Sequence, residues 1–407
     1  MLVFGIVLFA IGILLSVMWH ELGHFATARS FGMKVRRFYV GMGPKVFAVR
    51  RGETEYGVAA FPIGGFCDIA GMAASDELAS EDRSRAMWAK PAWQRIVVLL
   101  GGPFMNFVLG IALFFGVALV SGLPNMNYQP VDASQVPAVV GQTQCVQDGC
   151  TGKGPAGDAG IEPGDRIESI AGKPVSHWGD VSEIVSGLGG ESVPITVERG
   201  GQAVEMTAEI ASAQASDGSS RGILGITLDQ SAIPQSVRDD PAHQAINTFD
   251  DPLSAIGGTF TYTGRIVIET VKGIATFPSK IPAVAESIFG AERQEDSPVS
   301  IVGASHIGGQ VVQHGMWATF FLLLGALNFF LGGFNLIPIV PFDGGHIAVV
   351  IYEKIRDALR RLRGLAPAGP ADYEKLMPVT IAVFALLMCV SLIVIAADIV
   401  NPMMLPM

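Results

Sequence analysis

The stretch LLSVMWHELGHFATA, residues 14–28, reads as a membrane-spanning helix that carries two histidines and a glutamate. His20-Glu21-Leu22-Gly23-His24 fits the pattern H-E-x-x-H. Residues four apart lie on one face of a helix, so His20 and His24 can bind one metal ion while Glu21 reaches a water on that ion. Ionisable groups inside a span are unfavourable and seldom occur without a partner. The stretch predicts a zinc site at membrane depth; the alternative is a structural histidine pair at a helix end.

The composition indicates a polytopic membrane protein with a soluble part, because half of the 407 residues are hydrophobic and the mean hydropathy is +0.43. Four apolar segments each approach the roughly 20 residues that cross about 30 Å of hydrocarbon as a helix. The first has no basic leading region and no small-residue cleavage site, so we interpret it as a retained span rather than a signal peptide. The predicted spans are residues 1–28, 96–122, 317–346 (apolar to about 340) and 378–400.

The distribution of charge predicts the orientation of these spans. Ten Lys and Arg lie between residues 34 and 95, and six between 344 and 377, whereas residues 123–316 hold ten against 23 Asp and Glu. Short basic loops stay cytoplasmic and long acidic segments can be translocated. We therefore expect residues 34–95 and 344–377 inside, and residues 123–316 and both termini outside. No basic patch indicates binding to nucleic acid.

The segments between the predicted spans differ in composition and in the secondary structure that they predict. Residues 33–71 hold short β-prone pieces separated by glycine turns and predict a β-hairpin at or dipping into the cytoplasmic face. Residues 127–212 contain AGIEPGDRIESIAGKPV and alternating valine and isoleucine, typical of a small β-rich domain. We expect cytoplasmic connections at 72–95 and 347–377. Residues 213–316 predict a polar linker and then an amphipathic helix over about 253–290. This helix either rests on the outer membrane face or on the small β domain, or it is a connector without membrane contact.

A third metal ligand is expected from NLIPIVPFDGGH, residues 335–346. Pro338 and Pro341 break the third span and place Asp343 near membrane depth, where a carboxylate needs a metal or a counter-charge. The histidine pair on the first span and the carboxylate on the third are each unfavourable alone, and both are explained if they bind one ion. His346 is the rival ligand, and Asp343 is preferred because it lies at the break itself.

The four cysteines fall into two groups. Cys145 and Cys150 bracket CVQDGC in the outer segment, where we expect a local disulfide; two free thiols are the alternative, and a zinc site is less favoured because no histidine lies nearby. Cys67 and Cys389 are expected to be reduced. Four histidines in the outer segment are read as ordinary surface residues: His177, His243, His306 and His314.

Three motifs in order carry a family resemblance: HELGH in the first span, GGPFMN at 101–106 and NLIPIVPFDGG at 335–345. Over nearly its whole length the chain resembles the site-2 protease family of intramembrane zinc metalloproteases, in particular the bacterial four-span type with one PDZ domain. The resemblance implies a polytopic α-helical protein of the bacterial plasma (inner) membrane with four transmembrane helices. It also implies a cytoplasmic-side re-entrant β segment at 33–71 and an extracytoplasmic PDZ-like α+β domain at 127–212. Phe342, where the family usually has leucine, and the Cys145 to Cys150 insertion depart from the pattern.

The resemblance assigns roles to individual residues. It implies zinc ligation by His20, His24 and Asp343, with Glu21 as general base. Asn106 and Asn335 match positions thought to hold the substrate backbone or the developing oxyanion. Their alternative role is to join neighbouring helices by amide hydrogen bonds. The re-entrant β segment would pair with an unwound substrate strand.

The function implied is zinc-dependent intramembrane endopeptidase activity on single-span membrane proteins within the lipid bilayer. The substrates would be anti-sigma factors after a first cut by an upstream extracytoplasmic protease, or remnant signal peptides. The PDZ-like domain would either filter substrates by size or bind new C-termini, which the residues leave open. A catalytically inactive membrane PDZ adaptor with a structural metal site is the alternative from another class. A metal transporter is a weaker one, because the chain shows a single buried site.

Overall fold

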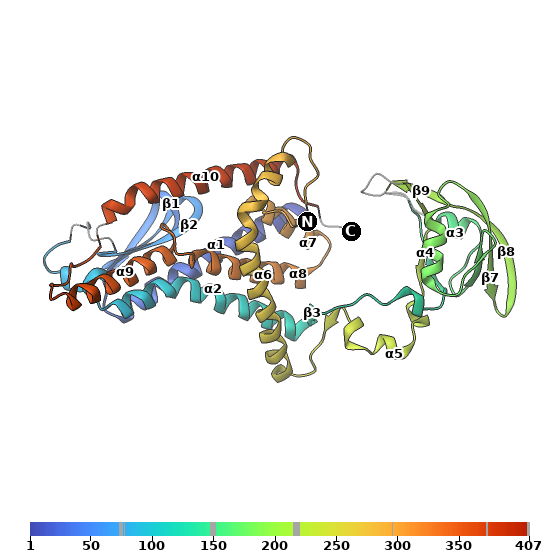
Figure 1. Ribbon diagram of the computed structural model, residues 1–407, viewed down its shortest axis with the longest axis horizontal. Helices are drawn as coiled ribbons and strands as arrows, with labels where there is room; N and C mark the ends of the chain where they lie inside the picture. Colours follow the sequence, from blue (N-terminus) through green and yellow to red (C-terminus); the bar gives the residue numbers. More distant parts are fainter. Residues whose placement is uncertain are drawn as a thin grey trace. The chain divides into compact units, whose positions relative to one another are not determined.

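The computed structural model describes the chain except residues 73–75, 77, 147–151, 215–219, 295, 372 and 405–407. The chain forms two compact units (Figure 1). A helical unit contains residues Met1–Leu123 and Thr248–Met407, and a β-rich unit contains Pro124–Asn247. We describe each unit by itself.

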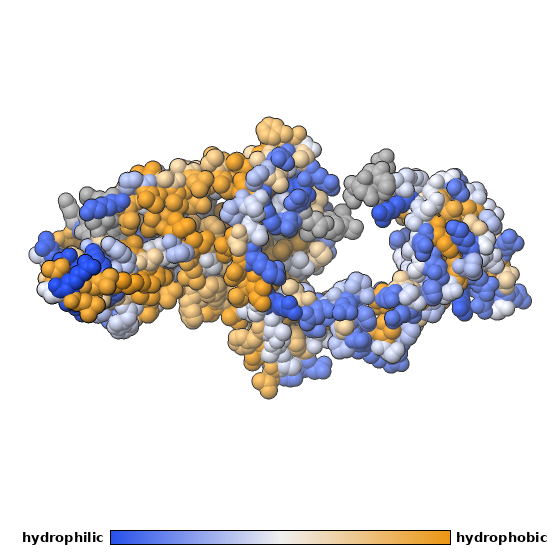
Figure 2. Space-filling model, in the orientation of Figure 1, coloured by the Kyte–Doolittle hydropathy of each residue, from blue (hydrophilic) through white to orange (hydrophobic). Residues whose placement is uncertain are grey.

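Four helices of the helical unit are long and apolar enough to cross a membrane, which confirms the four predicted spans. Large apolar side chains are exposed along them, as Figure 2 shows for one face of the unit. The second span begins four residues earlier than expected, and the third ends at Asn335. The helices are α1 (Leu2–Ser30), α2 (Ala92–Ser121), α8 (Trp317–Asn335) and α10 (Met377–Val400).

Close approach of glycines sets the packing of α1 against α2. A Cβ on Gly23 would collide with the carbonyl of Gly101, and a Cβ on Gly101 would meet the carbonyl of Gly23. On the other side of α1, the Asn328 Nδ2 of α8 donates a hydrogen bond of 2.9 Å to the Ser16 Oγ, and both residues are fully buried. This buried hydrogen bond between an amide and a hydroxyl fixes the depth of one helix relative to the other.

Residues 33–71 form an antiparallel hairpin of two strands, β1 (Val35–Arg51) and β2 (Thr54–Ile69), which folds back on itself so that Tyr56 pairs with both Phe38 and Val49. The turn lies at Gly52, as expected. The glycine run beginning at Gly41 was predicted to be a turn. It lies within the bounds of β1, but it joins two stretches of β1 that pair with the same part of β2, and the positive φ angles of Gly41 (82°) and Gly43 (91°) let the strand bend there.

Two further helices were not foreseen as such. Residues 347–377 were expected to be a loop, yet α9 (Asp343–Leu362) covers most of this range. A basic loop and a basic amphipathic helix have similar composition, so charge alone does not separate them. α7 (Ile301–Gln313) lies against the first half of α1, where a Cβ on Gly5 would come within 2.8 Å of the Gly309 Cα.

The amphipathic segment near 253–290 is α6 (Pro252–Ser287), which runs across the long helices of its unit in Figure 1. Its last turns pack with the C-terminal end of α10, where Val284 and Ala397 are fully buried. There the Arg293 guanidinium pairs with the Asp398 carboxylate at 2.5 Å, and both side chains are buried. Two short 3-10 helices, Arg83–Arg85 and Met87–Ala89, precede α2, and a third, Tyr373–Leu376, precedes α10.

The elements of the β-rich unit are, in chain order, β4 (Val140–Thr143), α3 (Gly154–Asp158), β5 (Arg166–Ile170), β6 (Lys173–Pro174), α4 (Trp178–Ser186), β7 (Ser192–Arg199), β8 (Gln202–Glu209), β9 (Ala211–Gln214), β10 (Ser220–Ile223), β11 (Ile226–Leu228) and α5 (Gln235–Arg238). Four strands form an antiparallel sheet in the order β6-β5-β7-β8. Inward residues alternate along β7, where Ile195 and Val197 are fully buried. The unit continues beyond 212, because β11 pairs with β4 and Leu224 belongs to the core. The short strands β3 (Leu123–Pro124) and β12 (Ile246–Asn247) pair with each other.

Candidate metal centre

Two imidazoles and one carboxylate from separate helices meet inside the helical unit. The Asp343 Oδ2 lies 3.2 Å from the His20 Nε2 and 3.4 Å from the His24 Nε2, and the two Nε2 atoms are 3.1 Å apart. Ligands placed tetrahedrally at about 2.0–2.1 Å from zinc stand about 3.3 Å from one another. The three atoms therefore already have the mutual spacing of zinc ligands.

The DGG sequence explains how Asp343 reaches this position. α8 ends at Asn335, and the chain turns back on itself before α9 begins at Asp343. A Cβ on Gly344 would collide with the carbonyl of Leu336, and one on Gly345 with the backbone nitrogen of Val340. Only glycines allow this compact turn, which brings the first residue of α9 to the histidines of α1.

Hydrogen bonds to the outer ring nitrogens direct both imidazoles at the centre. The His24 Nδ1 lies 2.8 Å from the Val98 carbonyl oxygen, so Nδ1 carries the proton and Nε2 keeps its lone pair. The His20 Nδ1 lies 3.2 Å from the Asn106 amide nitrogen, and the Asn106 Oδ1 has no partner among the described residues. Because amide nitrogen and oxygen are interchangeable on heavy-atom positions, a flipped Asn106 accepts from the His20 Nδ1. Both Nε2 lone pairs then face Asp343.

This arrangement fits a cation. Three acceptor atoms converge, the two histidines are 6% and 8% exposed, and the Asp343 Oδ2 has no hydrogen-bond partner within the described part of the chain. Buried acceptors that face one another are unfavourable unless a positive charge lies between them. Among the described residues, these three form the group of His, Cys, Asp and Glu side chains that can hold a metal ion. Two imidazoles and a carboxylate with a fourth position left for water are the donor set of a catalytic zinc site.

Gly102 of α2 leaves room for the two rings. A Cβ at this position would collide with the Nε2 atoms of both His20 and His24. The GGPFMN motif therefore contributes space as well as the amide of Asn106. This function of its second glycine was not predicted from the sequence.

Glu21 links the centre to the β1–β2 hairpin. Its carboxylate accepts a hydrogen bond from the backbone N–H of Cys67 on β2. Its Cγ lies 3.3 Å from the place of a Cβ on Gly65, so glycine is needed where the strand passes the glutamate. A glutamate next to a metal ligand and held by a backbone amide has the placement of a general base.

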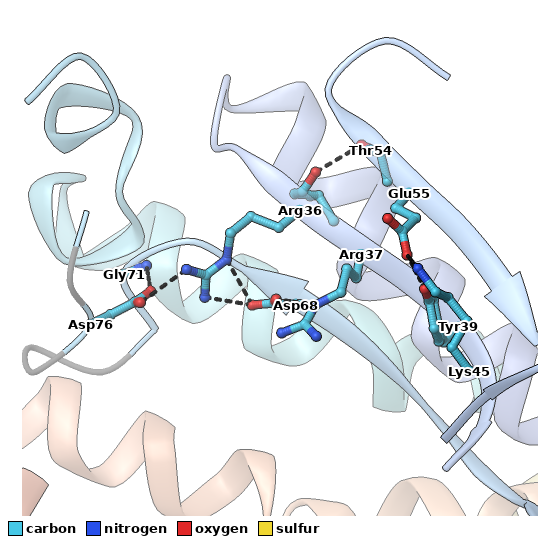
Figure 3. A network of polar contacts seen from close by, with 10 residues as sticks. Arg36, Arg37, Tyr39, Lys45, Thr54, Glu55, Asp68, Gly71 and Asp76 are labelled. Atoms are coloured by element: carbon cyan, nitrogen blue, oxygen red, sulfur yellow. Dashed lines mark hydrogen bonds and ion pairs between the residues drawn. The ribbon is translucent and has the colours of Figure 1, made fainter. Parts of the chain in front are cut away.

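An ion-pair cluster secures the strand that holds Glu21 (Figure 3). The Asp68 carboxylate, next to Cys67, accepts from the Arg36 guanidinium at 2.7 Å and from the Arg37 Nε at 2.9 Å. Arg36 also donates to Asp76 at 2.9 Å, and Asp76 accepts from the Gly71 amide. This role could not be predicted from the sequence, because the partners of Asp68 are 31 and 32 residues away.

The remaining predicted site residues lie apart from the three ligands or outside the description. The Asn335 Nδ2 donates to the carbonyl of Leu331, in its own helix. His346 lies one turn along α9 from Asp343 and is not one of the three grouped side chains. Cys145 is disulfide-bonded, but Cys150 lies outside the described residues, so the pairing stays a prediction. Cys67 and Cys389 are free thiols.

Comparison with known proteins finds similarity to a peptidase family and to bacterial zinc metalloproteases. Residues 8–366 match the model of a family described as peptidase family M50. The zinc metalloprotease Rip1 of Mycolicibacterium smegmatis is 44% identical, covering 98% of both chains. Rip1 of Mycobacterium tuberculosis is 42% identical, covering 100% of this chain and 99% of the relative. A putative zinc metalloprotease of Fusobacterium nucleatum is 31% identical, covering 86% and 88%.

Proposed function

The chain belongs to peptidase family M50, the site-2 protease family, and from that premise we propose that it cuts single-span membrane proteins by hydrolysis at the His20, His24 and Asp343 centre. It is an intramembrane zinc metalloprotease with four helices able to span a membrane. The convergence of three ligand atoms at zinc spacing on two separate helices carries the proposal. The adaptor alternative has no support from the relatives, which are named as metalloproteases.

Each residue of the centre has a separate task. His20, His24 and Asp343 hold zinc, which when bound polarises the scissile carbonyl and lowers the pKa of a water. Glu21 accepts a proton from the attacking water and later gives it to the leaving nitrogen. The backbone amide of Cys67 is a hydrogen-bond partner of the Glu21 carboxylate. Asn106 orients His20, and Asn335 at the end of α8 remains a candidate to bind the substrate backbone.

The β1–β2 hairpin is proposed to present the substrate to this centre. A helical substrate hides its peptide bonds in its own hydrogen bonds, whereas an added strand exposes them. A two-stranded hairpin has unpaired edges, and β2 already touches Glu21. Its exposed apolar residues, among them Val46 (69%) and Phe47 (63%), suit a segment that dips into lipid.

The orientation follows from charge. We propose that the basic hairpin and α9 lie on the cytoplasmic side of a bacterial plasma membrane, and that the acidic β-rich unit lies outside. That unit, with its small sheet and the α4 helix, is proposed to be a PDZ-like domain that filters or binds substrates first trimmed by another protease. Anti-sigma factors and remnant signal peptides fit as substrates because each retains one span after the outer cut.

The test is cleavage of a model single-span protein by purified enzyme in nanodiscs. We expect a cut near the basic side of the span, loss of activity with a chelator and its return with zinc. Zinc bound at one equivalent without any cleavage, across substrates with and without an outer domain, would contradict the proposal and favour a structural metal.

A further inference from the structure

Helix α9 has one covered face and one open face. Val350 (1% exposed) and Glu353 (6% exposed) face the inside, and the Glu353 Oε2 pairs with the Arg95 guanidinium of α2 at 2.5 Å. The large apolar side chains of the other face are exposed to between 46% and 85%. We call them the α9 stripe: Ile351, Tyr352, Ile355, Leu359 and Leu362.

The α9 stripe follows helical geometry. Its members recur at spacings of one, four, eight and eleven residues from Ile351, which gathers them on one side of the helix. A stripe of this size is unusual on a surface that faces only water. It needs an apolar cover that no described part of the chain provides.

Cations flank the stripe. Between residues 351 and 363 the two acids are already paired, Glu353 with Arg95 and Asp357 with Arg356. Lys354, Arg361 and Arg363 are exposed and have no ion-pair partner among the described residues. In Figure 2, strongly hydrophilic and strongly hydrophobic surface adjoin at the place of the last turns of α9. Whatever covers the stripe therefore combines apolar groups with negative charge.

The depth of the stripe points to the membrane surface. Glu353 meets Arg95 in the first turn of the α2 span, beside Trp93, which is 57% exposed and lies 5.2 Å from the Phe31 ring at the end of α1. Exposed tryptophans are typical of the membrane–water interface. The stripe thus begins at the level where the spans end and continues into the headgroup region.

We propose that the α9 stripe and its flanking cations bind the anionic phospholipids of the membrane surface at this end of the helical unit. The apolar side chains enter the acyl boundary, and Lys354, Arg361 and Arg363 meet headgroup phosphates. A second copy of the chain is a poorer occupant, because its own basic rim would face the same cations. The surface matters for the metal centre because α9 starts at Asp343, so lipid that holds α9 also holds a ligand.

The test uses the full chain with Leu359→Trp in nanodiscs, with the wild-type protein as the blank for its five native tryptophans. Quenching of the added emission is compared between brominated phosphatidylglycerol and brominated phosphatidylcholine at equal mole fraction. We expect several-fold stronger quenching by the anionic lipid. The double change Arg361→Gln with Arg363→Gln should abolish this preference, and Arg361→Lys with Arg363→Lys should keep it.

The matched control is Arg50→Gln with Arg51→Gln, which removes the same charge from the exposed turn of the hairpin and should keep the preference. Zinc content verifies that each variant is folded. Equal quenching by both lipids, or an equal loss of preference in the control, would overturn the role of the flanking cations. Absence of quenching by either lipid would overturn membrane binding and leave the stripe to a protein or a second copy.

Discussion

The Asn106 side-chain amide lies 3.2 Å from the His20 Nδ1, on the side of the ring away from the ligands. Asn106 is 1% exposed and sits on α2, whereas the metal ligands sit on α1 and α9. The asparagine thus acts on the metal through the orientation and tautomer of a histidine.

Asn106→Leu should weaken zinc binding about 10- to 100-fold, because the His20 Nδ1 loses its partner. Competition with a fluorescent chelator on purified protein measures this. Asn335→Leu is the matched comparison and should leave zinc affinity unchanged, since Asn335 bonds within its own helix. Unaltered zinc affinity in Asn106→Leu together with a raised KM would instead make Asn106 a substrate-binding residue.

Glu21→Gln should lower kcat by about 10²- to 10⁴-fold, because the amide cannot take the proton of the attacking water. Zinc content should stay near one equivalent, since Glu21 is not a ligand. Cleavage of a model span and metal analysis of the same preparation give both values. Glu183→Gln, on the exposed side of α4, serves as the control. Wild-type turnover in Glu21→Gln would remove the glutamate from the mechanism.

Gly102→Ala should weaken metal binding, because the added methyl group collides with both Nε2 atoms. We expect zinc affinity to fall by about tenfold or more, with a similar loss of activity. Gly116→Ala lies on the same helix, where a Cβ meets nothing within 4 Å, and should change neither. Full zinc occupancy in Gly102→Ala would show that the two rings sit elsewhere.

Asp68→Asn should reduce kcat about tenfold to a hundredfold without loss of zinc, because the strand that holds Glu21 loses its ties to Arg36 and Arg37. Glu55→Gln removes a more exposed pair of the same hairpin and should have little effect. Steady-state kinetics with metal analysis separates the outcomes. A parallel loss of zinc in Asp68→Asn would mean that the cluster supports the fold instead of the base.

Arg199→Gln should destabilise the β-rich unit. Burial acts to raise the pKa of the Asp165 carboxyl, but hydrogen bonds from Arg199 and the Glu162 amide outweigh it and hold the pKa below its ordinary value. A lowered folded-state pKa stabilises above the unfolded-state pKa, and this contribution disappears as pH falls through the folded-state pKa. We expect a loss of stability at neutral pH that is smaller than the full cost of an unpaired buried charge, because Arg199 is 35% exposed.

Hydrogen exchange of the β5 and β7 amides in the full chain measures this loss, which should shrink as the pH approaches the acid range. Arg238→Gln, at an exposed position of the same unit, is the comparison for removing a cation. A loss that is constant from neutral to acid pH would contradict the assignment to Asp165.

Features that depend on a short stretch of sequence could be predicted from the sequence alone. H-E-x-x-H on a helix, a carboxylate at a proline break and four apolar runs are readable because each feature lies within a short window. The space that Gly102 leaves for the two imidazoles and the ion pairs of Asp68 could not be predicted this way. The first depends on how closely α2 approaches α1, and the second on ion pairs across a hairpin.

Some predictions were wrong because two kinds of structure have the same amino-acid composition. The basic range 347–377 was predicted to be a loop, whereas α9 fills its first half, because a basic loop and a basic amphipathic helix have the same composition. In the β-rich unit the boundary at 212 fell short because β11 pairs with β4, a strand more than 80 residues earlier.

Protein contacts alone already hold the helices that carry the ligands. Asn328 fastens α8 to α1, and Arg95 fastens α2 to α9, both without the help of an ion. In small zinc modules the ion is what makes the chain fold, so removing it unfolds the molecule. Because neither contact involves a metal ligand, we expect the spans to pack together first and the metal to bind afterwards. Stripping the zinc should therefore leave a folded apoenzyme that recovers when the ion is returned.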